Sequence, residues 1–380
     1  MYDTRAEVEA LAAKTDPDFE QLMASVANGG GPGNHPRAMM LVTPFEQIAT
    51  FWQTMPQGPS LPDTPAQYTV RPTMRDGYES EARVYKSQSA AASSKTPLIV
   101  LIHGGGFCVG HWSHVGVHAR ALAHLYGATV CSVAYRLAPT HKFPTAPRDV
   151  WDALTWLTSE AGLAALGSDV DPASQGFVVG GVSAGANLAA VTAQKAGLLY
   201  ADGSAEKLPF PITGCWLSLP SVYDQEVVPD KYRELFVSRE QNARAPVINT
   251  AAIDYVRATY GFDAKSPEFT PGYGQGEDAP AKMPPTYLQV CGQDPLRDDG
   301  LIYDKVLRDN GVKTKLDVYP GVPHGFAELT DIPLAVKNRN DTLKGFSWLL
   351  GKEKEPTDEE CFGAWKVADE TATAPVEASG

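Results

Sequence analysis

The strongest chemical signal in this chain is Ser183, at the centre of the pentapeptide Gly181–Gly185. The pentapeptide follows the apolar run Phe177–Val179, which is typical of a buried strand. Glycines two residues either side of a serine allow a strand to turn sharply into a helix without steric collision. Such a turn exposes the hydroxyl, so Ser183 is a candidate nucleophile. It then needs a base, an acid to orient that base, and donors for an oxyanion.

A glycine-rich motif, His103–Phe107, follows an earlier apolar run. Alone it could be a tight turn. Ahead of a serine elbow, its consecutive amides predict a preorganised anion site. We expect the oxyanion to lie against the N–H groups of Gly105, Gly106 and Ala184. The histidine of the motif is expected to brace the loop rather than react.

The acid should come between the serine and the base in chain order. Asp294 follows the apolar run Tyr287–Val290, at a strand end where a carboxylate can accept a hydrogen bond from an imidazole. Asp298 is the competitor, but it falls where the next helix begins. A carboxylate there is explained by helix capping and the helix dipole. The pattern therefore favours Asp294.

The candidate base is His324, which lies in a loop framed by glycine and proline after the run Lys315–Tyr319. A lone loop histidine is usually a solvated residue. Its place after Ser183 and Asp294 instead fits a general base, and predicts activity that rises with pH as the imidazole loses its proton.

The elements that must position these residues are short apolar runs alternating with helical patterns. The expected strands are Tyr68–Arg71, Ala82–Tyr85, Leu98–Ile102, Thr129–Ala134, Phe177–Val179, Ile212–Leu217, Tyr287–Val290 and Lys315–Tyr319. The expected helices are His114–Leu125, Pro147–Thr158, Asn187–Ala196, Ala252–Thr259 and Leu301–Asp309. This alternation predicts an α/β fold with a mostly parallel sheet covered on both faces.

Three segments depart from this rhythm. Residues 1–60 contain weakly amphipathic helical stretches, broken by a glycine-rich loop at 29–33. Residues 219–281 form a long insertion whose aromatic residues favour an ordered lid. The acidic residues 352–380 predict a flexible tail, within which the patch Cys361–Trp365 could dock on the body.

Composition argues against several classes of partner and location. The net charge of −13 argues against a nucleic-acid partner. No apolar stretch is long enough to cross a membrane, and the N-terminus lacks the hydrophobic core of a signal peptide. The cysteines are scattered without a CxxC pair, so we expect a reduced, cytoplasmic protein.

Neither a metal nor a cofactor is expected. His111, His114 and His118 share helical spacing, but no nearby cysteine or carboxylate completes a ligand set, which favours a polar helix face. No P-loop is present. The glycines of residues 272–276 lack the strand and helix that a dinucleotide site requires.

Together these motifs resemble the hormone-sensitive-lipase-like branch of the α/β-hydrolases, a branch that includes carboxylesterases. The resemblance spans roughly residues 65–350. It rests on His103–Phe107, Tyr135–Pro139 with Phe143-Pro144, Gly181–Gly185, Asp294–Asp298 and His324–Phe326.

The resemblance implies an α/β-hydrolase fold with a mostly parallel eight-stranded sheet in residues 65–350. A helical cap would come from residues 1–60 and 219–281. It also implies Ser183 as nucleophile, His324 as general base and Asp294 as the residue that orients the base.

Two positions depart from the family pattern. Val182 stands where the family usually has aspartate, and Thr140 stands where it commonly has glutamate. Neither is a member of the triad, so the chemistry should survive. The missing charges point to a less typical pocket.

The predicted function is a serine hydrolase acting on small carboxylic esters or lactones. Apolar residues near the N-terminus would suit an acyl or aryl pocket, although they fit cap core equally well. They are Met39, Met40, Phe45, Phe51 and Trp52. A homodimer is left open.

Two other functions need weighing. The same triad could serve acyl transfer, cyclisation or elimination, which fold alone does not exclude. A non-catalytic receptor, as in the plant gibberellin receptors that resemble this family, is less favoured. Those receptors lack the catalytic histidine, whereas His324 is present here.

Overall fold

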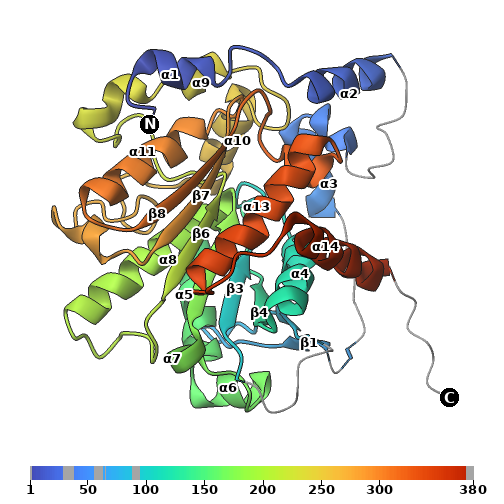
Figure 1. The fold of residues 1–380 in the computed structure, drawn as a ribbon. Helices are drawn as coiled ribbons and strands as arrows, with labels where there is room; N and C mark the ends of the chain where they lie inside the picture. Colours follow the sequence, from blue (N-terminus) through green and yellow to red (C-terminus); the bar gives the residue numbers. More distant parts are fainter. Residues whose placement is uncertain (1, 29–37, 55–62, 65, 88–94, 374–380) are drawn as a thin grey trace.

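An eight-stranded sheet forms the centre of the computed structural model, which describes residues 2–28, 38–54, 63–64, 66–87 and 95–373 (Figure 1). The strands are β1 (Gln67–Val70), β2 (Ala82–Tyr85), β3 (Leu98–Ile102), β4 (Thr129–Val133), β5 (Phe177–Val182), β6 (Gly214–Ser218), β7 (Thr286–Cys291) and β8 (Thr314–Tyr319). Their order is β1-β2-β4-β3-β5-β6-β7-β8. Pairing is antiparallel for β1–β2 and β2–β4 and parallel elsewhere, so the predicted mostly parallel sheet is confirmed.

The central strands are mainly apolar because both of their faces are covered. Every residue of β3, β4, β6 and β7 is buried. β5 runs three residues past its predicted end, through Gly180, Gly181 and Val182. The glycine at 180 is needed for packing, since a Cβ there would lie 2.8 Å from the Cβ of Trp216 on β6.

Fourteen α-helices surround the sheet in the described part of the chain. They are α1 (Arg5–Ala10), α2 (Pro17–Ala27), α3 (Phe45–Thr54), α4 (Gly116–Tyr126), α5 (Thr145–Leu157), α6 (Glu160–Leu166), α7 (Pro172–Gln175), α8 (Ala184–Ala201), α9 (Ser238–Gln241), α10 (Thr250–Tyr260), α11 (Arg297–Asp309), α12 (Phe326–Leu329), α13 (Pro333–Leu349) and α14 (Asp358–Thr373). None of the helices among these residues is long and apolar enough to span a bilayer.

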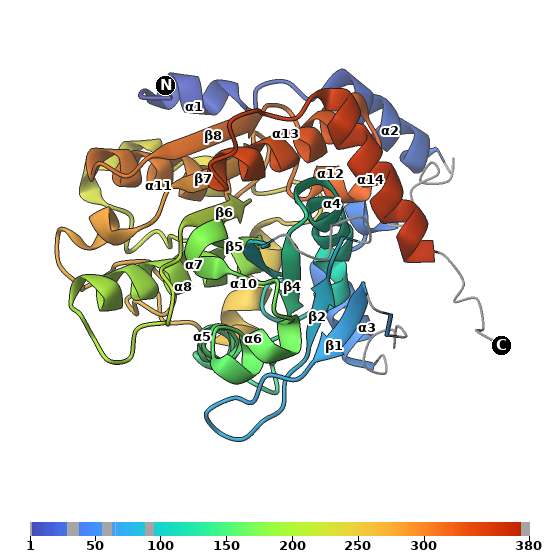
Figure 2. The same cartoon turned by 60° about the horizontal axis from the view of Figure 1, so that its bottom comes forward.

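Helices cover both faces of the sheet (Figures 1 and 2). α5, α8 and α11 pack against side chains such as Val100, Val179 and Leu288. α4, α13 and α14 pack on the opposite face, against Ile99 and Val178. The alternation of side chains along each strand therefore supplies both cores.

The C-terminal segment differs from the flexible tail expected from its acidic composition. Asp358–Thr373 form α14, which lies against α4 and α13. Cys361, Ala364, Trp365 and Ala368 recur at helical spacing and are all buried. This narrow apolar stripe anchors the helix despite the polar residues around it. Residues 374–380 and the glycine-rich loop at 29–33 lie outside the described residues.

The N-terminal segment and the insertion meet above the carboxyl ends of the strands. α3 contacts α10, and the ring centroids of Phe45 and Tyr255 lie 6.0 Å apart, edge to face. The turn after α1 is not part of the contact between α3 and α10. It packs instead on the loops that follow β7 and β8. There the amide of Gly321 donates to the carbonyl of Leu11 at 2.9 Å, and a Cβ on Gly292 would lie 2.1 Å from that carbonyl oxygen.

Candidate active site

Ser183 occupies a strained turn between β5 and α8. Its φ is +58° and its ψ is −119°, a conformation that non-glycine residues rarely adopt. A Cβ on Gly181 would lie 2.4 Å from the backbone of Gly185, and one on Gly185 would lie 2.2 Å from the carbonyl oxygen of Ile102. The two glycines are therefore required sterically for the turn, as the sequence predicted.

The structure brings Ser183, His324 and Asp294 together from three loops at the carboxyl edge of the sheet. The Nε2 atom of His324 lies 3.0 Å from the Oγ of Ser183. Its Nδ1 lies 2.7 Å from the Oδ2 of Asp294. All three are buried, with relative exposures of 7% for the serine, 5% for the histidine and 1% for the aspartate.

The geometry defines which atoms can exchange protons. Because the Oδ2 of Asp294 can only accept when ionised, Nδ1 of His324 donates to it, and Nε2 is left to accept from the serine hydroxyl. The second oxygen, Oδ1, accepts from the amide of Leu296 at 2.7 Å. This chain of hydrogen bonds can withdraw the proton of Ser183 as its oxygen attacks a carbon centre.

The anion site was predicted in the loop after β3. Gly105 and Gly106 have φ of +116° and +58°, which glycine adopts without strain. No backbone carbonyl of the described residues accepts from the amides of Gly105, Gly106 or Ala184. Amides left free beside a serine hydroxyl are suited to hold a developing oxyanion.

His103 braces this loop. Its ring is stacked on Tyr135 at a centroid distance of 4.3 Å, and its Nδ1 donates to the carbonyl of Gly104 at 2.8 Å. Burial lowers the pKa of His103 to about 3. The ring is therefore neutral at ordinary pH, which suits a structural part.

The other three histidines in this region contact different partners. His118 lies 3.3 Å from the carboxylate of Glu328, and His114 lies edge to face with Trp52 at 5.0 Å. His111 accepts from the amide of Ser113 at the start of a 3-10 turn. Helical spacing in the sequence does not gather their rings around one point.

Asp298 is buried in the first turn of α11 but does not contact His324. Its carboxylate instead accepts from the amides of Val237 and Ser238 and from Arg297. The preference for Asp294 as the partner of His324 agrees with this geometry. The expectation that Asp298 caps its own helix does not, because it binds a segment of the insertion.

A pocket of roughly 620 Å³, partly open to solvent, reaches the hydroxyl of Ser183. Its apolar lining comes largely from α3, α10 and the neighbouring loops. These residues are Phe45, Phe107, Ile248, Ala252, Ile253, Val256, Phe262, Phe269 and Leu296. A polar wall is formed by Ser221, Tyr223, Asp224 and Arg239.

The N-terminal apolar residues mostly lie elsewhere. Of the five predicted candidates, Phe45 lines the pocket. Phe51 and Met39 are 61% and 52% exposed, Met40 is also exposed, and Trp52 packs on His114. Apolar character alone did not separate the pocket wall from the outer surface.

The two departures from the family pattern do not touch this pocket. Val182 is half-buried and packs against apolar clusters. Thr140 is exposed.

The polar wall of the pocket was not predicted from the sequence. Its only available signal was the position of Ser221 and Tyr223 shortly after the carboxyl end of β6.

A model of the alpha/beta hydrolase fold family matches residues 99–328, more than half of the chain. The chain belongs to the α/β hydrolase family. The matched region includes the elbow serine, its two partners and the glycine-rich loop.

Relatives extend this match. A Schizosaccharomyces pombe protein described as an AB hydrolase superfamily protein is 33% identical over 299 residues, which cover 78% of this hydrolase and 84% of the relative. Esterase LipI of Mycobacterium tuberculosis is 31% identical over 264 residues, covering 69% and 75% of the two chains. A solved structure of vibralactone cyclase superposes with a TM-score of 0.73 and 28% identity, over 90% of this chain and 96% of that one.

Proposed function

We propose that this hydrolase cleaves carboxylic esters or lactones with an apolar acyl or aryl part, through an acyl-enzyme on Ser183. The observation that carries the proposal is the pair of hydrogen bonds of His324, 3.0 Å to Ser183 and 2.7 Å to Asp294. The relatives named as esterases support the same reaction class.

In the first step, Nε2 of His324 takes the hydroxyl proton as the Oγ of Ser183 attacks the ester carbonyl carbon. The carboxylate of Asp294 stabilises the imidazolium. The amides of Gly105, Gly106 and Ala184 hold the tetrahedral oxyanion, and losing one such donor typically costs about 3 kcal/mol.

Collapse of the tetrahedral intermediate breaks the bond to the leaving alkoxide, which takes the proton from His324. Water then enters, His324 removes one of its protons, and the oxygen attacks the acyl carbon. The second collapse returns the proton to Ser183 and releases the acid. The protein's own side chains supply every proton transfer, so the proposal involves no cofactor.

The pocket supports an uncharged, apolar substrate part next to the reacting carbonyl. Phe45 of the N-terminal segment and Ile253 and Phe262 of the insertion line this pocket together. Short or medium acyl chains and aryl esters fit this lining.

Hydrolysis can be separated from its rivals by products formed in ¹⁸O-labelled water. The proposal predicts one labelled oxygen in the released acid. It also predicts loss of turnover in S183A but not in S174A, because Ser174 is exposed on α7 and does not line the pocket. An acid product without label would contradict hydrolysis through an acyl-enzyme.

Cyclisation, acyl transfer or elimination is the second candidate, favoured by the structural similarity to vibralactone cyclase. In acyl transfer or cyclisation an alcohol or internal nucleophile would replace water on the same acyl-enzyme. These reactions predict turnover that still requires Ser183 but leaves no label in the product. A receptor would bind ligand without turnover.

A further inference from the structure

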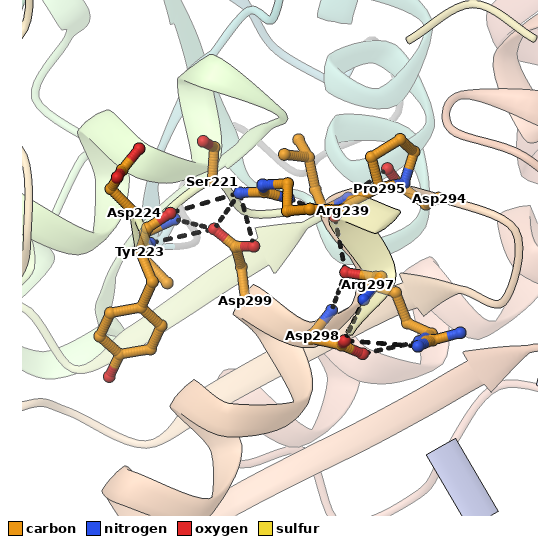
Figure 3. Close-up of polar contacts among 12 residues, drawn as sticks. Ser221, Tyr223, Asp224, Arg239, Asp294, Pro295, Arg297, Asp298 and Asp299 are labelled. Carbon is orange, nitrogen blue, oxygen red and sulfur yellow. Dashed lines mark hydrogen bonds and ion pairs between the residues drawn. The ribbon is translucent and has the colours of Figure 1, made fainter. Parts of the chain in front are cut away.

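A short segment of the insertion is hydrogen-bonded to the loop that carries Asp294. We call Val237–Asn242 the α9 segment and Cys291–Asp298 the acid loop. The Oδ2 atom of Asp298, a residue labelled in Figure 3, accepts from the amides of Val237 and Ser238, both at 2.6 Å. One carboxylate of the acid loop therefore holds the first two amides of the α9 segment.

The α9 segment in turn donates to backbone carbonyls of the acid loop. Asn242 Nδ2 lies 3.0 Å from the carbonyl oxygen of Asp294 and 3.2 Å from that of Gly292. Ser238 Oγ donates to the carbonyl of Pro295 at 2.6 Å, and Arg239 donates to the same carbonyl. These carbonyls flank or belong to the residue that orients His324.

The negative charge of Asp298 is balanced by an arginine of the acid loop. Arg297, which is fully buried, donates through Nε to the Oδ1 of Asp298 at 2.7 Å. Its Nη1 donates to the Oε1 of Gln241 at 2.8 Å and to the carbonyl of Gly292 at 3.1 Å. A buried ion pair with these further bonds fixes geometry, because moving either partner leaves a charge without compensation.

We infer that Asp298 is a positioning residue for the proposed reaction: through the α9 segment it fixes the backbone that aims Asp294 at His324. The inference rests on the proposed function of Ser183, His324 and Asp294. On this reading, the α9 segment belongs to the catalytic frame, although it lies in an insertion that also lines the substrate pocket. Displacement of a catalytic group by about 1 Å can cost on the order of a hundredfold in rate.

The competing explanation is that the carboxylate of Asp298 only stabilises the fold. Helix α11 offers a matched control for this explanation. Asp304 is also buried and lies in the same helix. It accepts from Thr314 Oγ1 at 2.6 Å and pairs with Arg308 at 2.7 Å. D298N and D304N each neutralise one buried, hydrogen-bonded aspartate of α11, but only D298N disturbs the acid loop.

The experiment measures two rates in the full-length variants: ester turnover per active serine and second-order labelling of Ser183 by a fluorophosphonate. We expect kcat and the labelling rate of D298N to fall by about ten- to a hundredfold, with KM close to wild type. D304N should lose thermal stability and keep wild-type values of kcat and labelling rate.

N242A provides a second route that leaves every charge in place. It removes the donor to the carbonyls of Gly292 and Asp294, so kcat and the labelling rate should fall in the same direction as in D298N. If D298N does not fold, N242A decides the inference alone. Equal labelling rates in wild type, N242A and any folded D298N would overturn it. Absence of Ser183 labelling and ester cleavage in the wild type would instead refute the proposed function.

Discussion

Phe45 packs directly against Gly106 in the loop after β3. A Cβ on Gly106 would lie 2.9 Å from the Cζ of Phe45 and 2.8 Å from a methyl carbon of Val256. The N-terminal segment and the insertion thus meet at one of the amides proposed to hold the oxyanion. In the proposed reaction, the residues that cover the substrate would therefore contact a group that holds the oxyanion.

Gly106→Ala should therefore damage catalysis as well as stability. The new methyl would push Phe45, Val256 or the Gly106 amide itself, and misplacing one oxyanion donor lowers kcat/KM by on the order of a hundredfold or more. The measurement is kcat/KM with a p-nitrophenyl ester, beside thermal unfolding.

Gly127→Ala is the matched control for this substitution. Gly127 has φ of +61°, close to the +58° of Gly106, but nothing lies within 4 Å of its Cβ position. It should cost about 1 kcal/mol of stability through backbone strain alone and leave kcat/KM unchanged. Wild-type kcat/KM in G106A would contradict a catalytic part for the Gly106 amide.

Trp365→Ala should destabilise the fold without altering chemistry. Trp365 of α14 is buried, with its ring edge to face with that of His118 on α4 at 5.1 Å, and removing a buried Trp side chain costs about 3–5 kcal/mol. Chemical denaturation gives the stability change, and turnover per labelled Ser183 should remain at wild type.

Phe362 is a suitable control because it lies in the same helix with 59% of its surface exposed. F362A should change stability little. If W365A and F362A were equally stable, α14 would not be anchored through its buried stripe.

Asp299 predicts a specific pH dependence of stability. Burial raises the pKa of Asp299 to about 7, although the guanidinium of Arg239 and the amide of Tyr223 lower it. An unfolded aspartate titrates near 3.9. Between about pH 4 and 7 the folded chain therefore holds a proton that the unfolded chain has lost, so the free energy of unfolding falls as pH rises through this window and levels off above it.

D299N removes the titrating carboxyl. The difference between wild type and D299N therefore isolates the contribution of Asp299 to the pH dependence of stability. Denaturant unfolding of wild type and D299N at several pH values should show the wild type losing stability relative to the variant as pH rises from 5 to 7. The slope of the difference approaches about 1.4 kcal/mol per pH unit. A pH-independent difference would mean that Asp299 stays ionised beside Arg239.

Continuous apolar runs made the sheet predictable. β3 has the predicted bounds because it is a continuous run of apolar residues. β2 also has the predicted bounds, although it contains Arg83. The site followed because parallel strands place their carboxyl ends at one edge, so Ser183, Asp294 and His324 in chain order had to converge. The residue types of these three positions and the loops that carry them could both be identified from the sequence.

Elements without a clear apolar stripe escaped prediction. α13 buries Asn338, Thr342 and Ser347 on its inner face, so its sequence lacks strong amphipathicity. α14 carries a narrow stripe within an acidic composition. α13 depends on tertiary partners such as Gln289, which accepts from Thr342 through Oε1 at 3.1 Å.

The contacts of Asp298 could not be predicted either. Val237 and Ser238 lie 61 and 60 residues before it, in a segment without regular periodicity. From the local sequence, Asp298 was expected to cap the N-terminus of α11. Only the packed structure shows that its acceptor capacity is used by the insertion.

The most direct measurement is the site of covalent labelling by a fluorophosphonate, mapped by peptide mass spectrometry and followed alongside ester hydrolysis. We predict a single adduct on Ser183, loss of hydrolysis in proportion to labelling, and neither labelling nor hydrolysis in S183A. An adduct on another residue that abolishes hydrolysis, or ester cleavage by S183A at the wild-type rate, would contradict the assignment of Ser183 as the nucleophile.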